Sequence, residues 1–382
     1  MSLPRSGMTR KALISLLNPL LPLAAVAALF MGTGCVRHDE VGEEEHPIAF
    51  EAGSMLLLDD LTKGATPKDA GDDVGNFLVF GVKTVSGNTY PVFEGGESGF
   101  VSHIEDVWRY SPVRFWDSNA SSYKFLGISG PEVDAEISYT TTPLAATVPY
   151  SINSQCDLMA SCYHRDSNAQ GELNTTDEVD MAFDHLLSAV SVVIYNDSPL
   201  QDVSLVHYGF RNLIISSNVT VTYSSTSPSI LWVEATKVKD TSNPLLLWTP
   251  NGTDGVKLTH KGDTDEDVNT HAHTPLVDAL NWDMMIPQNL NPLSLAPMLL
   301  VKYRLVDYSD DPEPEPILSE PIETPIRLNT IKTAGGEDIF DWVRGKKYIY
   351  EVHIRYGGGI SVTVTTTTWD AVSAGTPGLI VS

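Results

Sequence analysis

The strongest constraint on the fold is a set of short apolar runs that recur between Gly, Pro, Asn and Asp residues. The runs are rich in β-branched and aromatic residues, and no long stretch places apolar residues at helical spacing. They read NFLVFGVKT, VSLVHYGF, NVTVTYSS, SILWVEAT, MLLVKYRLV, KKYIYEVHI and ISVTVTTTTW. This pattern predicts an all-β protein made of antiparallel sandwiches rather than βαβ units.

Three segments bear on how the chain is organised. In DHLLSAVSVVIYND, residues 185–189 could open with a helical turn, while residues 190–195 are strongly β in character. The polar, turn-rich segment 163–180 divides the chain near its middle and is interpreted as a linker. Segment 307–325 is interpreted as a surface loop, because its prolines remove the N–H donors that a sheet centre needs.

The amino terminus has the layout of a secretory signal. A basic leader with Arg5, Arg10 and Lys11 precedes an apolar stretch over 12–30, and small residues then lead into Cys35. A retained membrane span is the alternative, but Pro19 and Pro22 would interrupt its helix. We therefore expect cleavage of residues 1–34 and lipidation of Cys35, although Gly32 stands where such signals usually have Leu. A buried leader cysteine without lipid stays an alternative.

Acidic residues follow this cysteine directly, in a segment poor in apolar residues that is not expected to fold. They are Asp39, Glu40, Glu43, Glu44 and Glu45. Residues 35–46 are thus a solvated tether, and the run also resembles the acidic export tag that sends some Gram-negative lipoproteins to the outer face of the outer membrane. Removal of the leader takes away three basic and no acidic residues, so the net charge moves from −25 to −28. Such a charge disfavours nucleic-acid binding.

The two remaining cysteines, Cys156 and Cys162, are too few for a disulfide framework. In an extended segment they lie about 20 Å apart, which is too far for a bond without a turn. We expect two unpaired, buried thiols. Zinc is a poor alternative, because Cys-x5-Cys with His164 nearby lacks a second ligand pair at a recognised spacing.

Motifs for catalysis are not found in the sequence, and we expect neither an enzyme nor a bound cofactor or metal. The best metal candidate is HKGDTDEDVNTHAH, in which acidic residues alternate before two histidines. They are Asp263, Asp265, Asp267, His271 and His273. An EF-hand requires Gly and Glu where this loop has Val268 and Thr274, so a solvated loop is the preferred interpretation.

An aromatic-rich stretch, WRYSPVRFWDSNASSYKF, supports two interpretations. Exposed rings would form a stacking platform for sugars, whereas evenly spaced aromatics on strands point to the core. The rings are Trp108, Tyr110, Phe115, Trp116, Tyr123 and Phe125. The core interpretation is preferred.

An ordered set of motifs resembles the fimbrillin family over nearly the whole chain after Cys35. In the first half they are HPIAFEAG, TKGA, FLVFGV, WRYSPVRFW, YKFLGISGP and DLMAS. In the second half they are VDMAFDHLLSAVSVVIYN, MMIPQNL, MLLVKYRLV, WVRGKKYIYEVHI and ISVTVTTTTWD. The most specific are Phe183-x-His185-x-x-Ser188, Ile286-Pro287-Gln288 and Gly345-Lys346-Lys347-Tyr348.

The resemblance implies two consecutive transthyretin-like β-sandwiches, here residues 47–177 and 178–382, in a surface lipoprotein of the outer membrane. Members of this family are pilins of type V fimbriae or their tip and anchor partners. A trypsin-like protease cuts after a basic residue near the first strand, and the strand that is lost leaves a groove for another subunit's strand. Such exchange is physically reasonable, because an unpaired sheet edge strongly favours strand addition. The expected partners are other fimbrial subunits, the outer membrane through the lipid, and a host or bacterial surface receptor.

The chain departs from the family at two places. Thr62-Lys63-Gly64-Ala65 stands where many relatives have Arg-Ala, so Lys63, or Lys68 as a fallback, is the candidate processing residue. The segment GTPGLIVS after Trp369 is short for a donor strand. A stalk, a tip and an anchor role all stay open. The rival hypotheses are a glycan-binding surface lipoprotein and a hydrolase with an unrecognised site.

Overall fold

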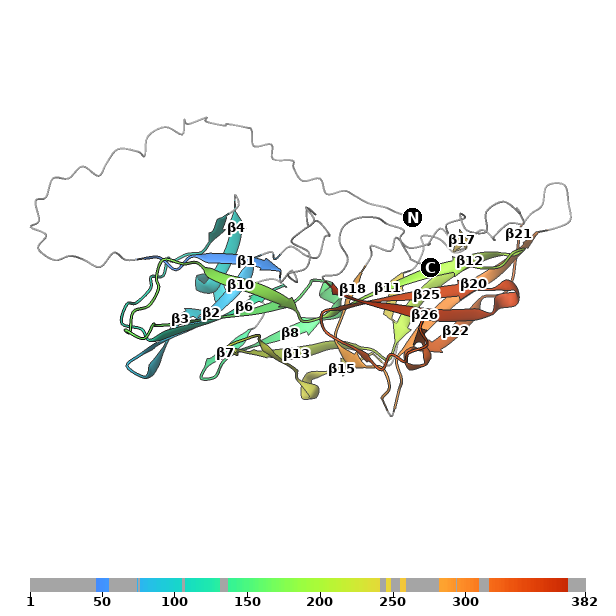
Figure 1. The fold of residues 1–382 in the computed structure, drawn as a ribbon. Helices are drawn as coiled ribbons and strands as arrows, with labels where there is room; N and C mark the ends of the chain where they lie inside the picture. The colour runs from blue at the N-terminus through green and yellow to red at the C-terminus, as the bar shows by residue number, and fades with distance from the viewer. Residues whose placement is uncertain are drawn as a thin grey trace, which may run out of the picture. The chain divides into compact units, whose positions relative to one another are not determined.

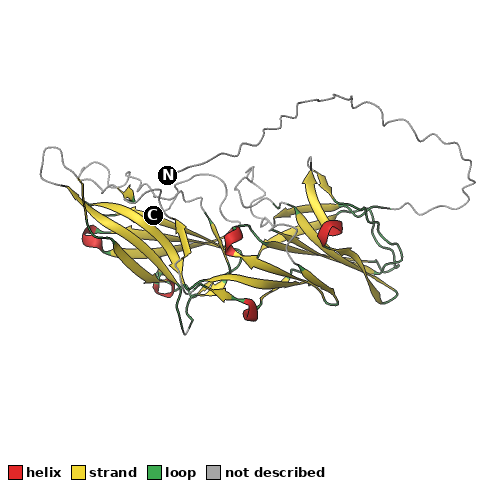
Figure 2. Cartoon of the chain, turned by 180° about the vertical axis from the view of Figure 1, so that it is seen from behind, coloured by secondary structure: helices red, strands yellow, loops and turns green. Residues whose placement is uncertain are grey.

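The computed structural model describes most of the chain after residue 45. The described residues are 46–54, 74, 76–104, 107–130, 137–240, 245–248, 255–258, 282–292, 294–308 and 316–369. Within them, strands dominate and the helical elements are single 3₁₀ turns (Figure 2). These turns are η1 (Gly96–Gly99), η2 (Ile152–Ser154), η3 (Glu234–Thr236), η4 (Leu328–Thr330) and η5 (Tyr356–Gly358). The predicted all-β class is confirmed.

The first sheet has the strand order β1-β10-β9-β6-β2-β4-β5, with β3 paired to β2 (Figure 1). Its strands are β1 (Phe50–Ser54), β2 (Phe77–Val85), β3 (Asn88–Glu94), β4 (Phe100–Ile104), β5 (Val107–Arg109), β6 (Ser122–Ser129), β9 (Met159–Asp166) and β10 (Val179–His185). The β2–β3 hairpin turns through Ser86 and Gly87, both at positive φ, which suits the right-handed twist of the two strands.

A second sheet has the order β14-β13-β8-β7, with β15 also paired to β13. Its strands are β7 (Ser138–Thr141), β8 (Leu144–Ser151), β13 (Ile214–Thr222), β14 (Ser229–Trp232) and β15 (Val238–Lys239). Strand β8 precedes residue 177 and β13 follows it, so this sheet joins the two predicted domains. The boundary at 177/178 stays a prediction, and β10, directly after it, lies in the first sheet with β9 and β1.

Two further sheets contain most strands of the second half of the chain. One has the order β18-β11-β25-β26-β23. Its strands are β11 (Ser188–Asn196), β18 (Asp283–Met285), β23 (Lys332–Thr333), β25 (Lys346–Ile354) and β26 (Ile360–Thr368). The other has the order β16-β12-β20-β21, with β17 on β12 and β22 on β20. Its strands are β12 (Asp202–Arg211), β16 (Leu245–Trp248), β17 (Val256–Leu258), β20 (Met298–Tyr308), β21 (Pro316–Leu318) and β22 (Ile322–Arg327). A short ladder pairs β19 (Gln288–Asn289) with β24 (Asp341–Trp342).

The sequence predicts antiparallel sheets, but three strand pairs of the structure are parallel. Strand β1 runs parallel to β10, β11 runs parallel to β25, and β23 runs parallel to β26. Parallel neighbours cannot be joined by a hairpin and must be distant in sequence, so local patterns do not reveal them. All nine residues of β11 are buried, as expected for a strand covered on both faces.

The ambiguous segment at residues 185–189 is not helical. Strand β10 continues to His185, a bend follows at Leu187, and β11 starts at Ser188. Both leucines of the bend, Leu186 and Leu187, are fully buried. Burial of two strands on either side of the bend outweighs the local helical preference of this stretch.

The two proline- or polar-rich segments begin and end inside strands. Strand β9 continues to Asp166, and β10 begins at Val179, so the non-strand part of the predicted linker is 167–178. In the second segment, Pro325 lies in β22, which pairs only with β20 among the described residues. A proline is tolerated there because an edge strand needs N–H donors on one side only.

The first sheet is buried on both faces, by two separate apolar cores. Leu78, Phe80 and Val82 of β2 belong to the larger core, which also contains Val148, Val219 and much of the second half of the chain. The alternate β2 residues, Phe77 and Val79, belong to a smaller core that we call the aromatic core. Its buried members are Ile48, Phe50, Val74, Phe77, Val79, Phe93, Val101, Trp116, Ala120, Tyr123, Phe125, Met159, Leu173, Val179, Met181 and Phe183.

A half-buried acid at the sheet edge makes stability depend on pH. Asp283 lies in β18 opposite Val190, and burial raises the pKa of its carboxyl from 3.8 to about 6. The folded state therefore binds this proton more tightly than the unfolded state, and stability falls as pH rises from about 4 to about 6.

We expect Asp283→Asn to raise the free energy of unfolding at pH 7, because the neutral amide avoids the cost of burying a charge. The gain over the wild type should shrink as the pH falls from about 6 and vanish near pH 4. Urea unfolding at several pH values measures it. Asp341→Asn, at an exposed position of β24, is the control and should show no such trend. A gain that persists unchanged at pH 4 would contradict this assignment.

Candidate functional site

The candidate site is the segment 46–54, which enters the first sheet at its edge (Figure 1). Strand β1 lies beside β10, with Phe50 in register with Val179 and Ser54 in register with Phe183. The segment is the first described part of the chain, and residues 55–73 separate it from the rest in sequence. The sequence favours a strand here, because Ile48 and Phe50 alternate with smaller neighbours.

Backbone hydrogen bonds hold this segment from two sides. On one side, Ile48 N donates to Arg114 O at 2.9 Å and Trp116 N donates to His46 O at 3.0 Å. On the other side, Val179 N donates to Ala49 O at 2.8 Å, and the parallel ladder with β10 continues from there. The segment therefore occupies a slot between the loop 110–116 and β10, and its departure would leave unpaired donors and acceptors on both walls.

Phe50 is the main side chain that fills this slot. It is 5% exposed, and its ring meets those of Phe77, Phe93, Tyr110 and Phe125 in edge-on geometry. The centroid separations are 5.6 Å to Phe93 and Tyr110 and 6.0 Å to Phe77 and Phe125. Such pairs add stabilisation beyond the burial of area. Phe50 thus completes the aromatic core, and Ile48, 1% exposed, extends it toward the loop.

A tyrosine ties the loop wall to the segment. The Tyr110 hydroxyl donates to Ile48 O at 2.7 Å, and Arg114 N donates to the same hydroxyl at 3.2 Å. Burial is the main cause that raises the pKa of Tyr110, so the phenol keeps its proton and stays a donor. The backbone carbonyl of any incoming strand could accept this hydrogen bond.

The other wall is positioned by a buried arginine. Arg165 is 7% exposed, and its guanidinium donates to the carbonyl oxygens of Asn174, Asp177 and Glu178 at 2.8–2.9 Å. The guanidinium also lies 4.4 Å from the centre of the Trp116 ring, a cation–π geometry. These bonds fix the loop that leads into β10. Arg165 therefore connects the two walls of the slot.

The far end of β10 meets the end of the last strand. His185 Nδ1 lies 2.6 Å from Asp157 Oδ2, and both side chains are buried. The His185 ring stacks on Trp369 at 4.2 Å between centroids. Trp369 N donates to Gly345 O, and Gly345 N donates to Leu187 O. Trp369, the last described residue, is thereby held next to the end of β10, the strand that pairs with β1.

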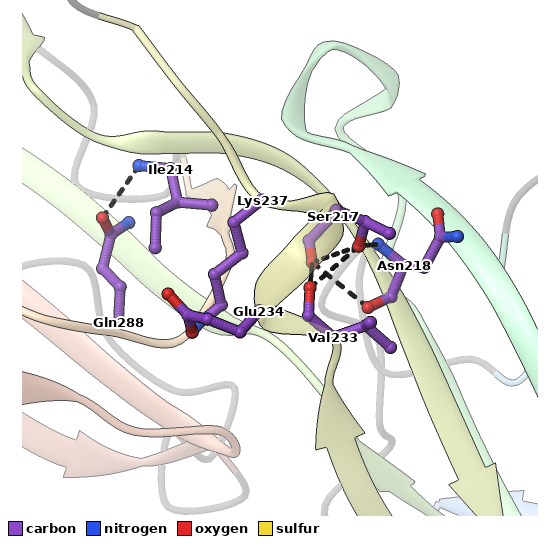
Figure 3. Close-up of polar contacts among 8 residues, drawn as sticks. Ile214, Ser217, Asn218, Val233, Glu234, Lys237 and Gln288 are labelled. Carbon is purple, nitrogen blue, oxygen red and sulfur yellow. Dashed lines mark hydrogen bonds and ion pairs between the residues drawn. The ribbon is translucent and has the colours of Figure 1, made fainter.

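The motifs behind the family resemblance have structural roles. Ser188 Oγ donates to Val343 O at 2.9 Å, and the Tyr348 hydroxyl accepts from Val343 N at 2.8 Å. Gln288 is buried, and its Oε1 accepts from Ile214 N at 2.9 Å (Figure 3). Gly345 has φ +66, which favours glycine at the turn before β25. These residues satisfy buried polar groups and bend the chain, so they specify the fold.

The sequence-predicted site residues are mostly outside the part of the chain that the structure describes. Cys35, the acidic tether, Lys63, Lys68 and the loop with Asp263 to His273 all lie outside the described residues. The processing candidates follow β1 and precede β2 in sequence. Their predicted roles stay predictions.

The aromatic-rich stretch contributes mainly to the core. Trp116, Tyr123 and Phe125 are buried, and Trp108 and Tyr110 are partly buried against them. The core interpretation is confirmed for these rings. Phe115 is the exception at 46% exposed.

The two described cysteines are free thiols, as expected, but neither is fully buried. Burial is nevertheless the main cause that raises the pKa of Cys162 to about 11, so this thiol stays protonated. Among the described residues, no group of three or more His, Cys, Asp and Glu side chains is placed to hold a metal ion. Within the same residues, no helix is long and apolar enough to cross a membrane.

Two functional features were missed at the sequence level. The Tyr110 hydroxyl bond to Ile48 and the Arg165 bonds to three carbonyls both have a backbone oxygen as acceptor. Because every residue has such an oxygen, the sequence carries no signal for these pairs.

Comparison with known proteins identifies the family. The profile of the fimbrillin-like family matches residues 68–369. Among solved structures, a fimbrial protein from Bacteroides vulgatus is 13% identical, with a TM-score of 0.44 and coverage of 85% of this chain and 99% of that one.

Two structures from Porphyromonas gingivalis are also similar. A fimbrilin is 11% identical, with a TM-score of 0.40 and coverage of 85% of this chain and 97% of that one. A tip fimbrial protein is 10% identical, with a TM-score of 0.38 and coverage of 85% and 100%. No curated protein matches the chain. The match over residues 68–369 covers most of the sequence, and the chain belongs to the fimbrillin-like family.

Proposed function

We propose that this chain is a cell-surface fimbrial subunit that acts in adhesion and assembles by donor-strand exchange. After proteolysis at Lys63 or Lys68, the segment that contains β1 leaves, and a partner's strand takes its place between β10 and the loop 110–116. The observation that carries this proposal is the position of Phe50, which fills the aromatic core although residues 55–73 separate it in sequence from most members of that core.

Covalent linkage explains why a cut would matter. In the uncut chain, residues 55–73 hold β1 close to its slot, so its effective concentration there is high. A cut after Lys63 or Lys68 removes this advantage, and any other strand then competes on equal terms. The open slot would offer unpaired backbone groups and an uncovered apolar pocket, the two features that favour strand addition.

The larger core should keep the rest of the chain folded after β1 leaves. Leu78, Phe80 and Val82 keep the first sheet packed on the second, and neither Ile48 nor Phe50 belongs to that core. Loss of β1 therefore opens one face of the first sheet and leaves the other covered.

The proposal includes a lipid anchor on Cys35 and an acidic tether over 35–46 at the outer membrane. Since the anchor precedes the cut, the lipid would leave with the released segment, and the shortened subunit would be held by its partners alone. Whether the role is that of a stalk, tip or anchor subunit depends on whether residues after Trp369 donate a strand. A glycan-binding lipoprotein is the less favoured candidate, because Trp116, Tyr123 and Phe125 are buried.

Trypsin-like treatment should shorten the protein at Lys63 or Lys68, leave both sandwiches folded and allow oligomers to form with partner subunits. Mass spectrometry, circular dichroism and size-exclusion chromatography measure these three outcomes. The double variant Lys63→Ala, Lys68→Ala should keep its amino terminus and stay monomeric. Deletion of residues 376–382 should weaken oligomers of a stalk subunit and leave the slot of a tip subunit functional. Unfolding on cleavage, or a cut product that stays monomeric with every partner, would contradict strand exchange.

Cys35→Ala should abolish metabolic labelling by palmitate and leave the leader uncleaved or the protein misrouted, because the thiol is the site of lipid attachment. Labelling of whole cells followed by immunoprecipitation measures the effect, with Cys162→Ala as the matched control that keeps its label. Equal labelling of Cys35→Ala and wild type would eliminate the lipoprotein proposal.

Replacement of the five tether acids by alanine should retain the lipid but reduce the amount of protein exposed on the cell surface. The acids are Asp39, Glu40, Glu43, Glu44 and Glu45. Digestion of intact cells by an external protease measures exposure, and replacement of the same residues by Gln separates loss of charge from loss of side-chain size. Unchanged exposure would reduce this run to a spacer.

A further inference from the structure

The slot occupied by 46–54 has a shape that selects its occupant, and this inference rests on the proposed strand exchange. Two side chains define the shape, Ile48 at 1% exposed and Phe50 at 5% exposed, two residues apart. Both enter the aromatic core. The backbone pairing on the two walls is indifferent to sequence, so the pockets for these two side chains determine which strands fit.

The Phe50 pocket is built for an aromatic ring. Four rings surround it at 5.6–6.0 Å, all in edge-on geometry, and those of Phe77, Phe93 and Phe125 are at most 1% exposed. A Leu or Val side chain in this position would leave part of the pocket empty and lose the edge-on ring contacts. The surrounding rings pack against each other as well, so the pocket has little freedom to collapse.

Strand β10 borders the rest of the slot. Ala52 is in register with Met181 and Ser54 with Phe183, and these two β10 side chains are buried at 0–1% exposed. They reach across β9 toward β6, since a Cβ added at Gly127 would lie 2.5 Å from Met181 Cε and 2.9 Å from Phe183 Cζ. The side chains that define the slot are therefore an aliphatic residue and an aromatic one two positions later.

Residues 370–382, read DAVSAGTPGLIVS, do not match this pattern. They contain no Phe, Tyr or Trp. Their best alternation is Leu379 with Val381, which supplies the aliphatic position and leaves the aromatic one filled by a smaller β-branched residue. Reversal of the strand direction does not help, because the aromatic position stays unfilled in either direction.

We propose that the slot accepts a strand with the alternation aliphatic-x-aromatic from a partner chain different from this one, and discriminates against residues 370–382 of a second copy. The subunit is then a junction between unlike subunits. Joints between like copies through this segment are disfavoured by the incomplete filling of the Phe50 pocket.

The test uses the full chain, cut by the trypsin-like protease, and fluorescently labelled peptides whose binding is followed by anisotropy. Peptide 46–54 should bind at least about tenfold more tightly than peptide 370–382, as expected for loss of one buried ring. Peptide 370–382 with Val381→Phe has the aliphatic-x-aromatic alternation at positions 379 and 381. It should bind about tenfold more tightly than the unmodified peptide 370–382. Peptide 370–382 with Ile380→Phe gains the same ring at the neighbouring position, which points to the opposite face of the strand. Its affinity should stay within about threefold of that of the unmodified peptide 370–382.

Each outcome has a distinct meaning. Equal affinity of the peptides 46–54 and 370–382, or equal gains from Val381→Phe and Ile380→Phe, would overturn the aromatic selectivity and leave strand exchange in place. If no peptide binds the cut protein, both the selectivity and the proposed strand exchange are wrong. As a second readout, peptide 46–54 with Phe50→Leu should lose most of the difference in affinity from peptide 370–382. Peptide 46–54 with Glu51→Gln should retain that difference.

Discussion

The candidate site depends on the burial of Phe50 among the rings of the aromatic core. The first sheet has apolar side chains on both faces, because β2 alternates Phe77 and Val79 with Leu78, Phe80 and Val82. One face is closed by strands in the middle of the chain. The other is closed in part by Ile48 and Phe50 from a terminal segment. A single sheet thus supports two cores, and one of them includes residues from a segment that residues 55–73 separate in sequence from its other members.

Much of the strand content could be predicted from the sequence. The runs that became β2, β12, β20, β25 and β26 are recognisable because their β-branched and aromatic residues act locally. The partners of these strands could not be predicted in this way. Parallel pairing of β11 with β25 joins residues more than 150 positions apart, such as Ser188 and Lys346, and no local pattern encodes that contact. The bend at Leu187 was ambiguous for the same reason, since tertiary burial determined its conformation.

The candidate site was predictable only as a segment. The alternation of Ile48 and Phe50 indicated a strand, but the two walls come from residues 110–116 and from β10, which are distant in sequence from the segment and from each other. Arg165 joins the walls through bonds to carbonyl oxygens and a contact with Trp116. Acceptors on the backbone leave no mark in the sequence. The site therefore became visible only when the register and the side-chain contacts were known.

Several residues of the family motifs hold the fold together by pairing buried polar groups. His185, Ser188, Gln288 and Tyr348 pair buried polar groups at bends and strand ends, where loss of a partner leaves an unsatisfied group. Such residues specify the body of the fold. The family profile matches residues 68–369, while β1 precedes this range and the segment that begins at residue 370 follows it. The rings of Phe77, Tyr110 and Phe125 around Phe50 lie inside the matched range, so the pocket falls within the part of the chain that identifies the family, whereas Phe50 itself lies before it.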